Sequence, residues 1–236
     1  MGKNRQPEQQ APPVQKIRLR YAKRDRARFT SHRDFGRAFE RALRRAHIPM
    51  AYSSGFNPHP RISYANASPT GAATEAEYLE IGLWEVCDPD KVRTELNDVL
   101  PPGFVILAAV VAEGGSLADG LEASLWEIEW PVTDADALAA AVAAFEASEQ
   151  VDVERMTKNG LRTFDARGAV RRIEVLDSGL RVLLEHMTPL VRPGDVLEAL
   201  ARVASDADVV FEVPLGAKQQ RLAQGSVVDG VVHNVF

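Results

Sequence analysis

Three side chains early in the sequence have the chemistry of general acid–base groups. His32, His59 and Tyr52 can each accept or donate a proton, and imidazoles titrate close to neutral pH. Together they could activate a ribose 2′-hydroxyl, which is the chemistry of a metal-independent ribonuclease. Each also has an ordinary structural role available: His32 in helix capping or a surface hydrogen bond, Tyr52 in the core. The sequence leaves both interpretations open.

A dense group of cations surrounds these residues. Residues 16–65 contain 13 Lys and Arg residues against three acidic residues, a net charge of +10, whereas the whole chain carries −5. The remaining residues therefore carry −15. A cationic segment in an acidic protein indicates a site for an anionic partner. Guanidinium groups bind phosphate through paired hydrogen bonds and stay charged at physiological pH, so we expect the partner to be RNA.

Two blocks contribute the candidate RNA contacts. The first is a predicted helix whose arginines, about four residues apart, lie opposite an apolar face. The second is the Gly/Pro-rich loop 53–61, whose prolines restrict the backbone around His59. The expected nucleic-acid contacts are Lys23, Arg24, Arg28, His32, Arg33, Arg37, Arg41, Arg44, Arg45, Tyr52, Phe56, Asn57, His59 and Arg61.

Each block also has a purely structural interpretation. The helix surface would be solvated, with Glu40 pairing Arg37 or Arg44 at helical spacing. The loop would be a rigid connection, and for Phe56 packing into the core is the expected fate. These alternatives remain open at the level of sequence.

The first half of the chain must position both blocks. Alternating residues predict strands, and apolar residues three and four apart predict helices. Ser31 and Asp34 resemble a capping box at the start of the basic helix, and Pro49 follows its end. The predicted elements are a strand over 17–21, the helix over 31–46, a strand over 76–84, a helix opened by Asp88 and Pro89, and a strand over 104–111.

The second half repeats this order. The predicted elements are a strand over 125–132, a helix over 137–147, strands over 170–176 and 180–186, a helix opening at Pro193 and a strand over 209–213. A β-α-β-β-α-β order is typical of ferredoxin-like domains, and the first half fits it if its long loop hides a strand. The predicted fold class is α+β, with two tandem ferredoxin-like (β-α-β-β-α-β) domains.

Composition sets the domain boundaries. A polar, proline-containing start predicts disorder, and a Gly/Ser stretch predicts a linker. The expected parts are a disordered arm at 1–15, the first domain at 16–112, a linker at 113–123, the second domain at 124–215 and a C-terminal tail at 216–236.

The cysteine count and hydropathy exclude several classes of protein. Cys87 is the only cysteine, so this chain alone cannot hold an iron–sulfur cluster or a cysteine-based zinc site. Two histidines without a carboxylate triad are a weak metal signal, and we expect no metal and no cofactor. Without an apolar signal segment or membrane span, a cytoplasmic protein is expected.

Three blocks of residues resemble a known family. They are Phe29–His32, the Arg-Ala-Leu-Arg-Arg-Ala run at Arg41–Ala46, and Tyr52–Ser63 with its Gly-Phe-Asn-Pro-His-Pro-Arg-Ile-Ser sequence. The chain resembles the radical-SAM-linked (radical-SAM-associated) protein family, a domain of unknown function, as a free-standing member. Ser54 departs from the family pattern, which usually has glutamine there. The resemblance implies a module that works beside a radical-SAM enzyme, because the three-cysteine cluster motif is missing here.

A looser likeness concerns fold alone. Tandem ferredoxin-like halves resemble CRISPR repeat-processing endoribonucleases, which use His, Tyr and Lys without metal. His32, Tyr52, His59 and Lys23 could take those roles, but the glycine-rich C-terminal loop of that group has no counterpart near Gly216.

We therefore expect an RNA-binding accessory module that presents a structured RNA to a radical-SAM-type partner enzyme. The alternatives are a metal-independent endoribonuclease using His32 and His59, and a protein-interaction domain whose basic surface docks an acidic partner. The missing cluster cysteines favour a role that is not itself enzymatic.

Overall fold

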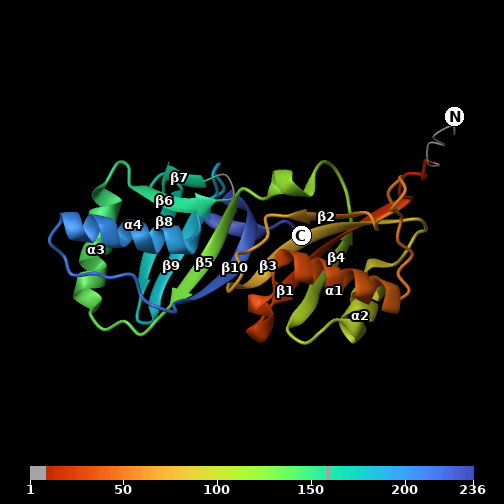
Figure 1. Cartoon of the computed structure of the whole chain (residues 1–236), viewed down its shortest axis with the longest axis horizontal. Helices are drawn as coiled ribbons and strands as arrows, with labels where there is room; N and C mark the ends of the chain where they lie inside the picture. The colour runs from red at the N-terminus through yellow and green to blue at the C-terminus, as the bar shows by residue number, and fades with distance from the viewer. Residues whose placement is uncertain (1–8, 158–159) are drawn as a thin grey trace. The chain divides into compact units, whose positions relative to one another are not determined.

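The computed structural model describes residues 9–157 and 160–236 and shows a mixed α/β fold (Figure 1). The chain divides into two compact units: an N-terminal unit of residues up to Gly120 together with Phe236, and a C-terminal unit, Leu121–Val235. The boundary falls inside the stretch predicted as a linker, 113–123. None of the helices in the described ranges is long and apolar enough to cross a membrane.

The N-terminal unit has the predicted β-α-β-β-α-β order. Its elements are β1 (Gln15–Lys23), α1 (His32–Arg45), β2 (Ile62–Ala65), β3 (Ala73–Leu83), α2 (Pro89–Val99) and β4 (Phe104–Val111), with a short 3-10 turn, Asp25–Phe29, before α1. The strand expected inside the long loop is β2. Within this unit the strands lie in the order β4-β1-β3-β2, each antiparallel to its neighbour.

Helix α1 forms where the apolar spacing and the cap predict it. The backbone N–H of Asp34 donates to Ser31 Oγ at 3.2 Å, and the Ser31 hydroxyl donates to Asp34 Oδ2 at 2.7 Å. The predicted apolar face, with Phe35 and Phe39, is buried in one core with Ile17 and Leu19 of β1. The helix ends at Arg45, four residues before Pro49.

The alternation of β1 separates two faces of this sheet. Ile17 and Leu19 point into the core that α1 and α2 cover, so the even-numbered Lys16 and Arg18 lie on the opposite side. We call these the helix-covered face and the helix-free face. Glu80 of β3 pairs in register with Arg18 and therefore also lies on the helix-free face.

The C-terminal unit adds strands to the predicted order. Its elements are β5 (Ala123–Glu129), α3 (Ala135–Ala147), β6 (Asp152–Thr157), β7 (Gly160–Asp165), β8 (Val170–Leu176), β9 (Gly179–Glu185), α4 (Pro193–Asp206), β10 (Lys218–Val228) and β11 (Val231–Asn234). The strands β10, β5, β9 and β8 lie side by side in that order, β11 pairs with β10, and β6 and β7 form a hairpin of their own. The predicted β8–β9 hairpin around Asp177 and Ser178 is confirmed.

One prediction near the C-terminal end of the chain needs correction. The closing strand expected over 209–213 is wrong: that segment is not a strand, and Val210 is 86% exposed. The closing strand is β10, which with β11 occupies most of the stretch predicted as a tail, 216–236. At the other end, residues 1–8 of the predicted arm, 1–15, lie outside the described residues. The end of this arm is attached to β3, because Val14 N–H donates to Leu83 O at 2.8 Å.

Candidate nucleic-acid interface

The outward face of α1 carries a row of cations. We call Arg33, Arg37, Arg41 and Arg44 the arginine ridge; all four side chains are exposed. Their spacing of three or four residues places them on one side of the helix, because 3.6 residues complete a turn. Arg44 Nη1 lies 4.0 Å from Glu40 Oε2. Within residues 9–157 and 160–236, the side chains of the other three ridge arginines form no ion pair or hydrogen bond.

The remaining cations of the predicted set have other surroundings. Arg24 donates through Nε and Nη2 to the Glu75 carboxylate at 2.7 and 2.6 Å. Arg45 donates to a main-chain carbonyl at the end of α2. The guanidinium of Arg28 lies 4.6 Å from the ring centroid of the following phenylalanine. Lys23 is only 6% exposed, so the free cationic surface is narrower than the predicted one.

His32 begins α1 at one end of the ridge. Its ring makes an edge contact with Tyr64 of β2, with centroids 4.7 Å apart. Burial, together with the negative charge of Glu40, raises the pKa of the Tyr64 phenol well above its usual value. Tyr64 is therefore a protonated neighbour that can donate a hydrogen bond but cannot act as a base near neutral pH.

The loop between α1 and β2 closes on itself. Ser53 N–H donates to His59 O at 2.9 Å, and His59 N–H donates to Ser53 Oγ at 3.0 Å. Arg61 Nε donates to Tyr52 O at 3.1 Å. The expectation that Phe56 packs into the core is wrong, because its side chain is 80% exposed at the tip of this closed loop. Connecting loops run over the protein surface, so a ring at a loop tip has no core beside it to pack against.

The three candidate acid–base residues do not form one site. His59 lines a hollow with Lys16 and Glu80, two residues of the helix-free face. His32 instead contacts Tyr64, which packs against the core on the helix-covered face. A ribonuclease centre that uses both histidines on one ribose is not supported by this placement. In the described part of the chain, no group of three or more His, Cys, Asp or Glu residues is placed to hold a metal ion.

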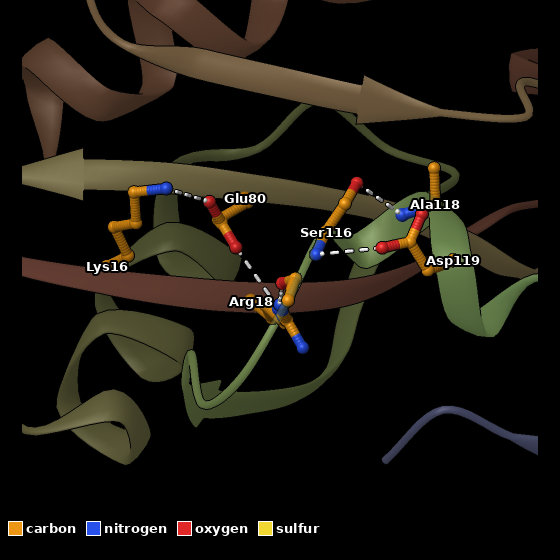
Figure 2. A network of polar contacts seen from close by, with 7 residues as sticks. Lys16, Arg18, Glu80, Ser116, Ala118 and Asp119 are labelled. Atoms are coloured by element: carbon orange, nitrogen blue, oxygen red, sulfur yellow. Dashed lines mark hydrogen bonds and ion pairs between the residues drawn. The ribbon is translucent and has the colours of Figure 1, made fainter.

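The structure adds a charged network that sequence reasoning missed. Glu80 accepts from Lys16 Nζ at 2.8 Å and from Arg18 Nε at 3.1 Å, as Figure 2 shows. Arg18 Nη2 also donates to Gly115 O in the segment after β4. In the sequence the network appears only as two cations on alternate residues of one strand and an acid on another. The pairing can be recognised once the β1–β3 register is known.

The Glu80 network makes stability depend on pH. Burial of Glu80 is the largest single effect and disfavours its charged form, but the hydrogen bonds and positive charges of Lys16 and Arg18 together outweigh burial and lower the pKa. A lowered pKa in the folded state means that Glu80 contributes stability above its unfolded-state pKa and that this contribution is lost as pH falls through the folded-state pKa. We expect E80Q to be less stable than the wild type at pH 7, with the difference narrowing at about pH 3.

Urea unfolding of both proteins at the two pH values measures this difference. The matched control is E95Q on α2, whose surface pair with Lys91 spans 3.7 Å and is expected to contribute little at either pH. A destabilisation by E80Q that is the same at pH 7 and pH 3 would show that ionisation of Glu80 does not stabilise the fold.

The candidate site lies within the part of the chain that matches a known protein family. A family model described as "Uncharacterized protein conserved in bacteria (DUF2344)" matches residues 16–193, which include the arginine ridge, the loop and the Glu80 network. No curated protein matches. A solved structure described as an unknown protein from Galdieria sulphuraria is similar over 90% of this chain and 99% of that chain, with 18% identity and a TM-score of 0.27.

Proposed function

This chain belongs to DUF2344, the family described as uncharacterized proteins conserved in bacteria, and we propose that it binds structured RNA through the arginine ridge. The observation that carries the proposal is that Arg33, Arg37 and Arg41 are exposed on one helix face and form no side-chain ion pair within the described residues. Guanidinium groups left without carboxylates are available for phosphate, which they bind through two parallel hydrogen bonds.

The length of the ridge favours a polymer over a small ligand. Arg33 and Arg41 are eight residues apart, a rise of about 12 Å along the helix. A single phosphate cannot contact both, whereas successive phosphates of a nucleic-acid strand can. His32 lies at the start of the same row, where helix N–H groups favour negative charge.

We further propose a partner for this chain and a topology for its two units. The resemblance to radical-SAM-linked proteins motivates a role as an accessory subunit that presents the bound RNA to a radical-SAM-type enzyme in the cytoplasm. We propose ferredoxin-like topology for each unit, supported by the β4-β1-β3-β2 and β10-β5-β9-β8 strand orders. The β6–β7 hairpin and β11 would then be additions to the second domain.

The salt dependence of RNA binding tests the main proposal. Each phosphate neutralised contributes roughly 0.7–0.9 to the slope of log affinity against log salt. Three ridge arginines therefore predict a slope of about −2 to −3 for the purified chain titrated into a labelled RNA hairpin. An absence of binding at about 50 mM salt would disprove the proposal, since electrostatic attraction is strongest there.

A further inference from the structure

A second cationic site lies on the helix-free face of the N-terminal unit. Two hollows of about 350 and 380 Å³ share three lining residues, Lys16, Ser63 and Glu80. Each volume is near the lower end of the range for small-molecule pockets, roughly 300–1,000 Å³. The first hollow is also lined by His59 and Arg61, and the second by residues 114–118. The two hollows adjoin at these shared residues; we call them together the groove, and the first hollow is its cationic end.

Charge is not balanced within this groove. Lys16, Arg61 and Glu80 line the groove, and Arg18, which lines neither hollow, pairs with Glu80 beside it. Lys16 also pairs with Glu80. The formal net charge of these four groups is therefore +2. Arg61 uses Nε to hold the Tyr52 carbonyl, which leaves the two terminal nitrogens of its guanidinium for a ligand.

Pro13 and Arg61 approach β3 closely because residue 82 is a glycine. A Cβ atom added at Gly82 would lie 2.8 Å from Pro13 Cγ and 3.3 Å from Arg61 Cβ. Only glycine allows both residues to approach β3 at this point. Backbone hydrogen bonds fix the same region: Gly82 N–H donates to Arg61 O at 2.9 Å, and Arg61 N–H donates to Ala51 O at 2.8 Å. Arg61 is thus preorganised at the edge of the groove.

We propose that this groove binds the phosphate monoester of a small organic molecule, with the phosphate at Lys16, His59 and Arg61. A phosphate monoester carries about −1.5 to −2 at pH 7, which matches the +2 of Lys16, Arg61 and the Arg18–Glu80 pair, whereas a single carboxylate would leave a positive charge uncompensated. The organic part would occupy the second hollow, beside Gly114, Gly115 and Ser116 (Figure 2 shows Ser116 next to the Glu80 network).

This site is separate from the arginine ridge and does not depend on RNA binding there. Lys16 and Glu80 lie on the helix-free face, and the ridge lies on the outer side of α1, across the sheet. Two sources could supply the same phosphate chemistry: a free mononucleotide, or the 5′-terminal phosphate of an RNA strand. The experiment therefore includes a probe for each source.

Isothermal titration of the full chain with 5′-AMP, and with adenosine for comparison, tests the proposal. We expect 5′-AMP to bind and adenosine not to bind. The variant K16Q/R61Q should bind 5′-AMP at least about tenfold more weakly, because charge-assisted hydrogen bonds are lost. K16Q alone, at a side chain that is 56% exposed, should weaken binding in a protein that still folds, although the variant loses one partner of Glu80. The control R37Q/R41Q removes the same charge from the ridge and should bind 5′-AMP like the wild type.

A second arm compares a short RNA carrying a 5′-phosphate with the same RNA carrying a 5′-hydroxyl. Tighter binding of the phosphorylated RNA that K16Q/R61Q abolishes would support the site with an RNA end as the source. Binding of 5′-AMP without any preference between the RNAs would support it with a free nucleotide as the source. The proposal is overturned if the wild type does not distinguish 5′-AMP from adenosine, or if K16Q and K16Q/R61Q both bind 5′-AMP as tightly as the wild type.

Discussion

The variant R37E/R41E is expected to bind an RNA hairpin about a hundredfold more weakly than the wild type at about 0.1 M salt. Both arginines lie at the centre of the arginine ridge, and neither forms a side-chain ion pair in the described residues. Their replacement removes two phosphate contacts and adds two negative charges that repel the RNA. Both side chains are exposed, so the free energy of unfolding should change by no more than about 0.5 kcal/mol.

The matched control changes the same net charge on the neighbouring helix. In K91E/R93E two cations of α2 are reversed, the exposed Lys91 and the half-buried Arg93, but each already has an acidic partner: Lys91 lies 3.7 Å from Glu95, and Arg93 lies 3.1 Å from Asp90. We expect less than about a tenfold loss of affinity from this control. Fluorescence anisotropy with one labelled hairpin measures all three proteins. Equal weakening by both variants would show that total charge, and not the ridge, determines RNA affinity.

Phe35→Ala is expected to destabilise the protein by about 3–5 kcal/mol, the usual cost of removing a buried phenylalanine side chain. Phe35 is buried at the start of α1 and stacks on Tyr21 with ring centroids 4.4 Å apart. It also contacts the rings of Phe104 at 5.0 Å and Tyr64 at 6.1 Å. The substitution would leave a cavity beneath the first turn of the ridge helix, which the surrounding rings cannot fill.

Chemical denaturation measures this cost, and the chain offers a control with the same chemical change. Phe56→Ala removes a ring that is 80% exposed and should change the free energy of unfolding by less than about 0.5 kcal/mol. A Phe35→Ala protein as stable as the wild type would mean that the aromatic cluster does not hold α1 on the sheet.

The ridge helix could be predicted from sequence because its signals are local. Phe35, Phe39 and Leu43 recur at helical spacing, and Ser31 stands where a capping residue is needed. The same holds for β4, whose observed bounds are the predicted ones, and for α2, where Asp88 Oδ1 accepts from Asp90 N–H at 3.0 Å. In each case the residues that determine the element lie within a few positions of one another.

Strand β10 of the C-terminal unit could not be predicted in this way. β10 buries Arg221 and Gln224, so its sequence lacks the apolar alternation that marks a strand. The closing strand is instead predicted over the nearby apolar residues 209–213, although Val210 is exposed. Burial of polar side chains depends on partners from distant segments, and these are invisible to local periodicity.

The candidate site shows the same limit. The sequence indicated one cationic segment and one partner. The structure instead places those cations on two sides of a sheet, because the cations of β1 point to the helix-free face, whereas α1 packs on the other face and carries the ridge on its outer side. Lys16 and Arg18 therefore join Glu80 and Arg61 on the helix-free face, while the ridge lies outside α1. The β1–β3 register then brings Glu80 opposite Arg18, and that register is a non-local property.

Crosslinking tests the central claim most directly. The full chain is irradiated with bound RNA in cells, the RNA is trimmed with nuclease, and the crosslinked peptides are identified by mass spectrometry. We expect the crosslinked peptides to fall within residues 29–45, which contain the ridge and the three residues before α1. Recovery of no RNA, or crosslinks confined to residues 121–235, would contradict RNA binding by the arginine ridge.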